Sequence, residues 1–261
     1  MSILDLVQKK LKKPVDISKA TILEKLKQHL SSEMIELEAT FEQGDLLDCK
    51  IGGSYLQPLN AKPLKESMRL LAQINFAQVD FPYAKSGLLQ FFIDAEHEMF
   101  GLNIEQPCIQ EGFCVRYLSL QDLQACKEIK GYQKGYMPFT QDTCYKLVGK
   151  KAVQTMLDCD YRFDQCFESL FQFKYQQLSI DERFELMEEL DSYNVQMLGY
   201  PTFCQFDPRE QVYEEYDTLL FQMGSFRDIM IFDGGILNFF IKQKDLEKLD
   251  FSNILYNWDC F

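Results

Sequence analysis

The chain has 261 residues, 46% of them hydrophobic and 14% aromatic, and it carries 27 basic against 40 acidic side chains. This length allows a sizeable hydrophobic core, and the net charge of −13 disfavours nucleic-acid binding, because phosphate backbones are repelled by a negative field. No apolar run approaches the ~20 residues of a membrane span, and the first residues lack the order of a signal peptide. We therefore expect a cytoplasmic protein without a membrane partner.

The N-terminal region, residues 1–45, is expected to form a helical and strand extension. Apolar residues at helical spacing predict helices over 2–13 and 17–30. Residues 34–41 alternate between apolar and polar side chains, which is typical of a strand. The segment 48–63 contains several Gly and Pro residues and is predicted to be a loop.

The rest of the chain is dominated by segments rich in aromatic and aliphatic residues, which favour strands. We expect strands over residues 68–76, 87–93, 112–120, 144–156, 217–223, 228–232 and 235–241. The strands do not alternate regularly with helices, which favours an α+β, β-rich fold of mostly antiparallel sheets. Short helices are expected at the N-terminus and near 180–190, and the segment that follows Asp207 also has a helical pattern.

The helix over 180–190 is the clearest in the sequence. Ser179 and Glu182 have the spacing of a capping box at its N-terminus. An apolar stripe at helical spacing is predicted to face the core, and it comprises Ile180, Phe184 and Met187.

Two segments of the chain resemble each other. GLLQFFI over 87–93 and GILNFFI over 235–241 are identical at five of seven positions. A Gln-x-Asn/Asp pattern precedes each segment, at Gln73, Asn75, Gln205 and Asp207. The alternative is chance similarity in a chain rich in Leu and Phe.

No low-complexity linker divides the chain, so we expect a single compact domain over 1–261. The similar segments predict an internal duplication with approximate repeats over 50–120 and 197–261. The second repeat then carries extra residues, which is tolerable because insertions into loops have a small entropic cost.

Several motifs together resemble the YwqG-like family of uncharacterised bacterial proteins. They are KIGGSYL, LLAQINF, GLLQFFI, GYPTFCQFDPR, LLFQM, GGILNFFI and DFSNILYNWDC. The resemblance covers about residues 50–261 and implies a β-rich fold with internally related halves in a cytoplasmic bacterial protein. It implies no activity. One position departs from the family pattern, because Tyr55 stands where a Pro is expected after the paired glycines.

Candidate ligand-binding residues come from the two repeats and one turn. They are Gln73, Asn75, Gln205, Asp207, Arg209 and Asp233. Repeats related by an approximate twofold could bring their polar residues into one cleft, where Arg209 would bind a carboxylate or phosphate. Strand alternation places Gln73 and Asn75 on the same face of their strand.

An architectural interpretation of these residues is also open. Asp207 has the position of a helix N-cap, Pro208 suits the first helical position, and Glu210 could complete a capping box. Asp233 precedes two glycines and is typical of a tight hairpin turn. In that case these side chains shape the backbone and bind no ligand.

Metal and cofactor chemistry has little support in the sequence. The nine cysteines form no C-x-x-C pair and there are only two histidines, so we expect free thiols, no metal site and no cofactor. Activation of a Ser or Cys nucleophile usually requires a histidine, and no such set is evident.

We therefore expect a non-enzymatic binding or protein-interaction module. Its acidic segments, 180–191 and 209–217, would attract a basic protein partner. The alternative is a hydrolase or small-ligand-binding enzyme that uses Asp207, Asp233 and Arg209 in a cleft between the repeats. The sequence identifies no small-molecule ligand and assigns no reaction.

Overall fold

The structure, a computed structural model, describes residues 17–130, 135–140 and 142–261. The helix expected over 2–13 lies outside these residues. The strands are, in chain order, β1 (Ser31–Gln43), β2 (Lys50–Gly52), β3 (Tyr55–Pro58), β4 (Met68–Asn75), β5 (Leu88–Asp94), β6 (Phe113–Leu118), β7 (Cys126–Ile129), β8 (Cys144–Thr155), β9 (Val195–Leu198), β10 (Thr218–Gly224), β11 (Ile236–Ile241) and β12 (Ile254–Asp259).

Ten of these strands form one sheet in the order β12-β11-β10-β9-β1-β8-β2-β4-β5-β6, and β3 pairs with β7 in a separate two-stranded ribbon. All neighbouring strands are antiparallel. The expected β-rich, mostly antiparallel fold with few short helices is confirmed.

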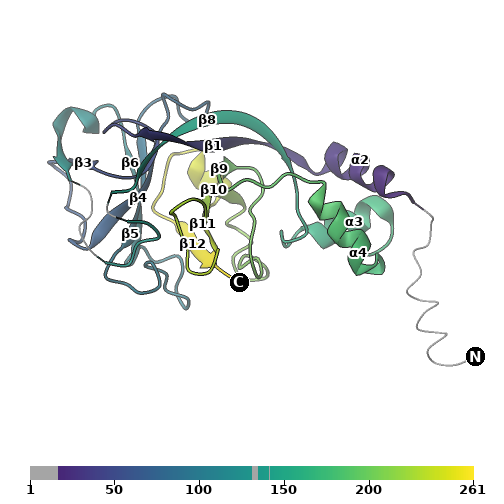
Figure 1. The fold of residues 1–261 in the computed structure, drawn as a ribbon. Coiled ribbons are helices and arrows are strands. Elements are labelled where there is room, and N and C mark those ends of the chain that lie inside the picture. The colour runs from purple at the N-terminus through teal and green to yellow at the C-terminus, as the bar shows by residue number, and fades with distance from the viewer. Residues whose placement is uncertain (1–16, 131–134, 141) are drawn as a thin grey trace, which may run out of the picture.

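The long strands β1 and β8 pair in the middle of the sheet. The two ends of the sheet, β4-β5-β6 and β10-β11-β12, lie side by side beneath this pair (Figure 1). The apolar faces of the two ends meet and form the main core. Phe91 of β5 lies 5.0 Å from Phe239 of β11 between ring centroids, and Phe113 of β6 lies 5.0 Å from Tyr256 of β12. The sheet is therefore rolled so that its edge strands approach each other.

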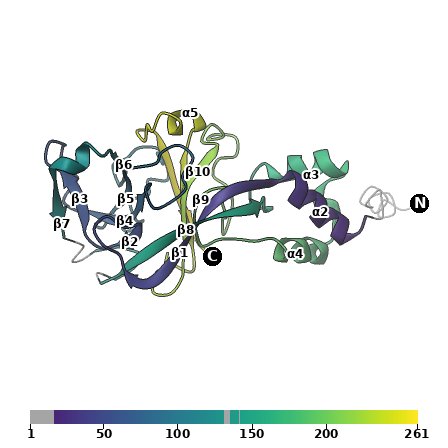
Figure 2. The same cartoon turned by 90° about the horizontal axis from the view of Figure 1, so that it is seen from above.

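Three helices form a separate group at one end of the molecule, which we call the helical arm (Figures 1 and 2). They are α2 (Lys19–His29), α3 (Phe163–Phe171) and α4 (Ile180–Glu188), and the short η2 (Tyr175–Gln177) lies between α3 and α4. The arm has its own core, in which α3 contributes Phe163, Phe167 and Phe171 at intervals of four residues. The remaining short helices are η1 (Asp122–Ala125) and α5 (Gln243–Leu246).

Two segments differ from their predicted structure. The predicted loop over 48–63 contains β2 and β3. The predicted strand over 228–232 forms turns, because Arg227 and Phe232 adopt left-handed backbone angles (φ 51° and 47°). Its apolar residues, Ile229 and Ile231, are nevertheless buried in the main core.

α4 begins with the capping box that the sequence predicts. Ser179 N donates to Glu182 Oε2 at 2.8 Å, and Glu182 N donates to Ser179 Oγ at 3.2 Å. Replacing Ser179 with Ala should lower the free energy of unfolding by about 1 kcal/mol. Thermal unfolding followed by circular dichroism should show a Tm lower by about 2–4 °C. The exposed Ser192 lies outside any helix, and a Ser192→Ala variant that loses as much would contradict a capping role.

Candidate functional site

Gln73 and Asn75 hold the loop between β1 and β2. The fully buried Gln73 donates from Nε2 to the carbonyl oxygens of Leu46 and Asp48, each at 3.0 Å. Asn75 donates from Nδ2 to the carbonyl oxygen of Leu47 at 2.8 Å. The two amides thus lie on one face of β4, as strand alternation predicts, and they satisfy backbone groups there.

Asp207 and Arg209 form a buried ion pair. Arg209 is 0% exposed and donates from Nε and Nη2 to the two carboxylate oxygens of Asp207, at 2.9 and 2.6 Å. Its guanidinium also lies 4.5 Å from the ring centroid of Phe240. Segment 208–217 forms turns in place of the helix that would begin at an Asp207 cap. Asp207 Oδ1 instead accepts a hydrogen bond from the backbone N of Arg209 at 3.0 Å. Asp207 therefore closes an Asx turn.

A second Asp-x-Arg pair completes this cluster. Arg162 donates from Nε and Nη2 to Asp160 at 2.8 and 2.6 Å, and Arg209 Nη2 donates to Asp160 at 3.2 Å. Burial raises the pKa of Asp160, but the hydrogen bond from Arg162 and the charge of Arg209 outweigh it, so the pKa lies below its usual value. Asp160 therefore links Arg162 to the buried pair as a carboxylate.

The other two predicted residues lie near the end of the chain. Gln205 is exposed and donates from Nε2 to the carbonyl oxygen of Cys260 at 2.6 Å. Asp233 is exposed in the turn before Gly234, which has φ 72°. Among the described residues no hydrogen bond connects Gln73 or Asn75 with this region or with the buried ion pair. The structure thus brings Asp207 and Arg209 together, but the six predicted residues do not form one common site.

The surfaces on which the two ends of the sheet meet are filled by aromatic rings. Phe91 lies 4.7 Å from Phe221 and 5.0 Å from Phe239, and Phe239 stacks on Tyr256 at 4.6 Å. All four side chains are fully buried. These rings fill the space between the two ends of the sheet and leave no room there for a ligand. A ligand that contacts both ends must therefore bind at the edge of this packed region.

One such cleft, of about 580 Å³, lies between β1, segment 80–85 and the loop after β9. Arg162 reaches its wall, as do Tyr200, Lys151 and Asp80. The hydrogen bonds and charges of Lys151 and Lys85 lower the pKa of Asp80 to about 2. The lysines of this cleft are therefore already paired with a carboxylate.

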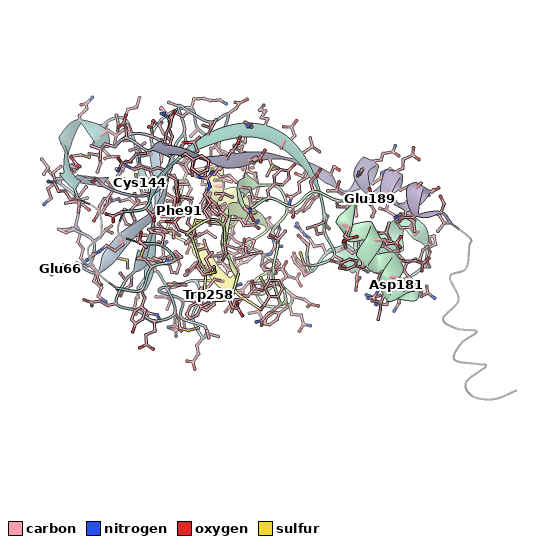
Figure 3. The ribbon with its side chains drawn as sticks, viewed as in Figure 1. Glu66, Phe91, Cys144, Asp181, Glu189 and Trp258 are labelled. Carbon is pink, nitrogen blue, oxygen red and sulfur yellow. The ribbon has the colours of Figure 1, made fainter. Side chains whose placement is uncertain are left out.

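α4 exposes two large apolar side chains, Ile180 (74%) and Phe184 (64%), one helical turn apart. The sequence predicts that both face the core, whereas the structure buries Leu186 in their place. Asp181 and Glu188 lie three and four residues from Phe184 and are exposed beside it (Figure 3 labels Asp181). We call these four side chains the α4 surface.

Charges around the α4 surface are only partly paired. Lys19 of α2 lies 3.1 Å from Glu185 and 4.0 Å from Glu189, both on the side of α4 near α2. Within the described part of the chain, Asp181 and Glu188 form no ion pair. The α4 surface is therefore apolar at its centre and acidic at its rim.

The described residues contain neither a cluster suited to a metal ion nor a membrane-spanning helix. Across 17–130, 135–140 and 142–261, no group of three His, Cys, Asp or Glu side chains is placed to hold a metal ion. No helix in these ranges has the length and apolar character needed to cross a membrane. All nine cysteines are free thiols.

Comparison with known proteins identifies a family and no activity. None of the curated proteins matches the chain. A family model described as a domain of unknown function, DUF1963, matches residues 49–260, which run from the start of β2 to the end of β12 and include α3 and α4. This is well over half of the chain, and the protein belongs to the DUF1963 family.

Proposed function

We propose that this protein is a non-enzymatic protein-interaction module that binds a basic, amphipathic segment of a partner protein on the α4 surface. The observation that carries the proposal is the exposure of Ile180 and Phe184 on one face of a helix. Apolar patches with a polar rim mark interaction sites on soluble proteins. Two anchors at positions i and i+4 are the pattern that helix-to-helix docking uses.

The charge of the α4 surface supports a basic partner. Asp181 and Glu188 flank the apolar pair, and the chain as a whole carries −13. Opposite charge on a partner would speed its encounter with α4, while burial of the Phe184 ring would supply affinity. A partner with an apolar stripe and lysines or arginines beside it satisfies both requirements.

The position of the helical arm also supports this role. α3 and α4 lie within residues 156–194, the connection from β8 to β9. The connection from β1 to β2, on the other side of the central pair, is much shorter and consists of residues 44–49. The arm packs in a cluster apart from the main core. It can therefore contact a partner without disturbing the sheet.

A charge-reversing substitution of Phe184 tests the proposal. The probe is a fluorescent synthetic peptide of leucines and lysines that forms a basic amphipathic helix, and its binding is followed by anisotropy. Phe184→Glu should weaken binding at least about tenfold, because it removes the apolar anchor and adds a charge. Phe206→Glu is the matched control, since Phe206 is 70% exposed and lies outside the arm. Equal binding by the two variants would contradict the proposal.

A second candidate function is the binding of a small carboxylate in the cleft of about 580 Å³. It is favoured by Arg162, which Asp160 and the buried Arg209 hold at the cleft wall. A direct catalytic use of Asp207 and Arg209 is not supported, because both are buried away from the cleft lining. Citrate, a small carboxylate, should then raise the Tm of the unmodified protein. It should leave the Tm of the Arg162→Gln variant unchanged. Equal shifts in both proteins would rule this candidate out.

We further infer that the sheet is an internal duplication. The four strands β2-β4-β5-β6 lie in chain order on one side of the central β1–β8 pair, and β9-β10-β11-β12 lie in the same order on the other. β4 is irregular between Leu70 and Ala72 opposite β5, and β10 is irregular between Leu219 and Phe221 opposite β11. When these two irregularities are superposed, LLAQINF (70–76) aligns with LLFQMGS (219–225).

This alignment changes the equivalences between the halves. Gln73 corresponds to Gln222, not to Gln205, because Gln73 pairs across the strands with Gln90 and Gln222 with Asn238. The ends of β2 and β9 also have the same backbone conformation, with two successive residues at positive φ. The angles are 69° and 76° at Gly52 and Gly53, and 62° and 70° at Leu198 and Gly199. A profile of relatives should align 68–94 with 217–241 more strongly than unrelated segments, and a random score would contradict the duplication.

We also propose, from the motifs given above, that the protein is a YwqG-like bacterial protein of the cytoplasm. The DUF1963 match over residues 49–260 covers most of the motif-bearing region, 50–261. Fractionation of the source cells should recover the protein with soluble cytoplasmic markers. Recovery with an exported fraction would contradict the proposal.

A further inference from the structure

The β3–β7 ribbon lies at the end of the molecule opposite the helical arm (Figures 1 and 2). A cavity of about 340 Å³ borders this ribbon. Its walls are the β3–β7 ribbon, segment 63–70 before and within β4, and the residues just before β8. Glu66 lies at this end and Asp181 at the other (Figure 3). The cavity is thus independent of the α4 surface.

The side chains that line this cavity are strongly basic although the chain is acidic. Four cationic residues contribute, Lys65, Arg69, Lys127 and Lys130. Among the described lining residues, Glu66 is the single carboxylate. Strand alternation in β7 directs Lys127 to the cavity, while its neighbour Glu128 lines a different hollow. The cavity therefore has a local excess of positive charge.

Lys127 and Lys130 are the cations available to a ligand. Lys65 pairs with Asp94 at 2.6 Å, and Arg69 donates to the carbonyl oxygen of Met68 at 3.0 Å. Lys127 and Lys130 are exposed and form no ion pair within the part of the chain that the structure describes. An anion between these two lysines would be bound by charge-assisted hydrogen bonds.

A fifth cation lies directly behind the cavity wall. The guanidinium of Arg116 donates to Gln57 Oε1 at 2.7 Å, to Gln90 Oε1 at 2.7 and 3.1 Å, and to the carbonyl oxygen of Leu56 at 2.9 Å. All of these acceptors are neutral. Burial lowers the pKa of Arg116, which indicates that its charge is poorly solvated. A negative charge in the cavity would stabilise this guanidinium from the other side of Gln57.

The rest of the lining is apolar. Tyr55, Met68, Ile129 and Phe139 contribute to it, and Tyr55 is held edge-on against Phe92 at 4.8 Å. A flat hydrocarbon group could pack against these side chains and lose its contact with water. We infer that this cavity binds a small organic anion, with its charged group at Lys127 and Lys130 and its apolar body against Tyr55 and Phe139.

The test uses 1-anilinonaphthalene-8-sulfonate, an aromatic sulfonate whose fluorescence rises in an apolar site. All measurements are made in the Phe184→Glu background, so that the α4 surface does not compete for the probe. Lys127→Glu/Lys130→Glu should weaken binding at least about tenfold, because two attractive charges become repulsive. Both lysines are exposed, so the double variant should unfold at the same temperature as its parent.

The matched control is Lys174→Glu/Lys248→Glu, which makes the same charge change at two exposed lysines outside the cavity lining. It should change the affinity by less than about twofold. The neutral analogue N-phenyl-1-naphthylamine should bind the Lys127→Glu/Lys130→Glu protein as it binds the parent, since it carries no charge. The inference is overturned if the Lys127→Glu/Lys130→Glu variant binds the sulfonate as tightly as the parent does, or if the control loses as much affinity.

Discussion

Replacing Asp207 with Ala should lower the free energy of unfolding by about 3–5 kcal/mol, because it leaves the charged Arg209 buried without its main partner. The Arg209 guanidinium would lose its two hydrogen bonds to the carboxylate and keep only the one to Asp160 at 3.2 Å. Its Nη1 is already buried without a hydrogen-bond partner. In thermal unfolding we expect a Tm lower by about 10 °C.

Asp233 provides the matched control for this prediction. It is also an aspartate and also a candidate from the sequence, but it is exposed in a turn. Asp233→Ala should change the free energy of unfolding by less than about 0.5 kcal/mol. A loss of only about 1 kcal/mol in Asp207→Ala would instead be the cost of a lost helix cap, and it would contradict the buried ion cluster.

Replacing Phe239 with Ala should cost about 3–5 kcal/mol, the range for truncating a buried phenylalanine. Its ring is fully buried and contacts Phe91, Phe221 and Tyr256, which come from both ends of the rolled sheet. The cavity left behind would therefore loosen the contact between the two ends, where little relaxation is possible.

Urea unfolding of Phe239→Ala and Phe261→Ala measures this effect. Phe261 is 83% exposed, so its truncation should cost less than about 0.5 kcal/mol. A loss below about 1 kcal/mol in Phe239→Ala would mean that the two ends of the sheet do not share a packed core. The space between the two ends of the sheet would then again be a candidate position for a ligand.

The long strands were predictable because burial on one or both faces dictates their composition. β4, β5, β8, β10 and β11 all lie within or next to predicted ranges. The short strands β2, β3, β7 and β9 have three or four residues each, too few for a periodic pattern to emerge. β2 ends in glycine and β3 in proline, so their turn residues concealed the strands.

The sequence singled out Asp207 and Arg209 as candidate residues, but it did not predict that they form a buried ion pair with each other. In Asp207-Pro208-Arg209 the spacing suits a helix cap, but the carboxylate binds the arginine two residues on. The deciding partner, Asp160, is distant in sequence, so local pattern could not reveal it. The repeated Asp-x-Arg motif, at 160–162 and 207–209, was the available signal.

The exposed apolar pair on α4 shows a different limit of sequence reasoning. Helical spacing groups Ile180 with Phe184, but it does not say which face of the helix meets the core. Burial of Leu186 against the other arm helices decides the orientation of α4. Exposure of the Ile180–Phe184 face is therefore a tertiary effect, and it is the observation on which the proposed function rests.

The most direct measurement is an amide chemical-shift map of the whole chain during titration with the basic leucine–lysine peptide. The largest shifts should fall within Ile180–Glu188, with smaller ones in the neighbouring α2, and they should diminish as salt screens the acidic rim. Shifts confined to the sheet, or none at peptide concentrations that saturate a micromolar site, would contradict an interaction module that acts through α4.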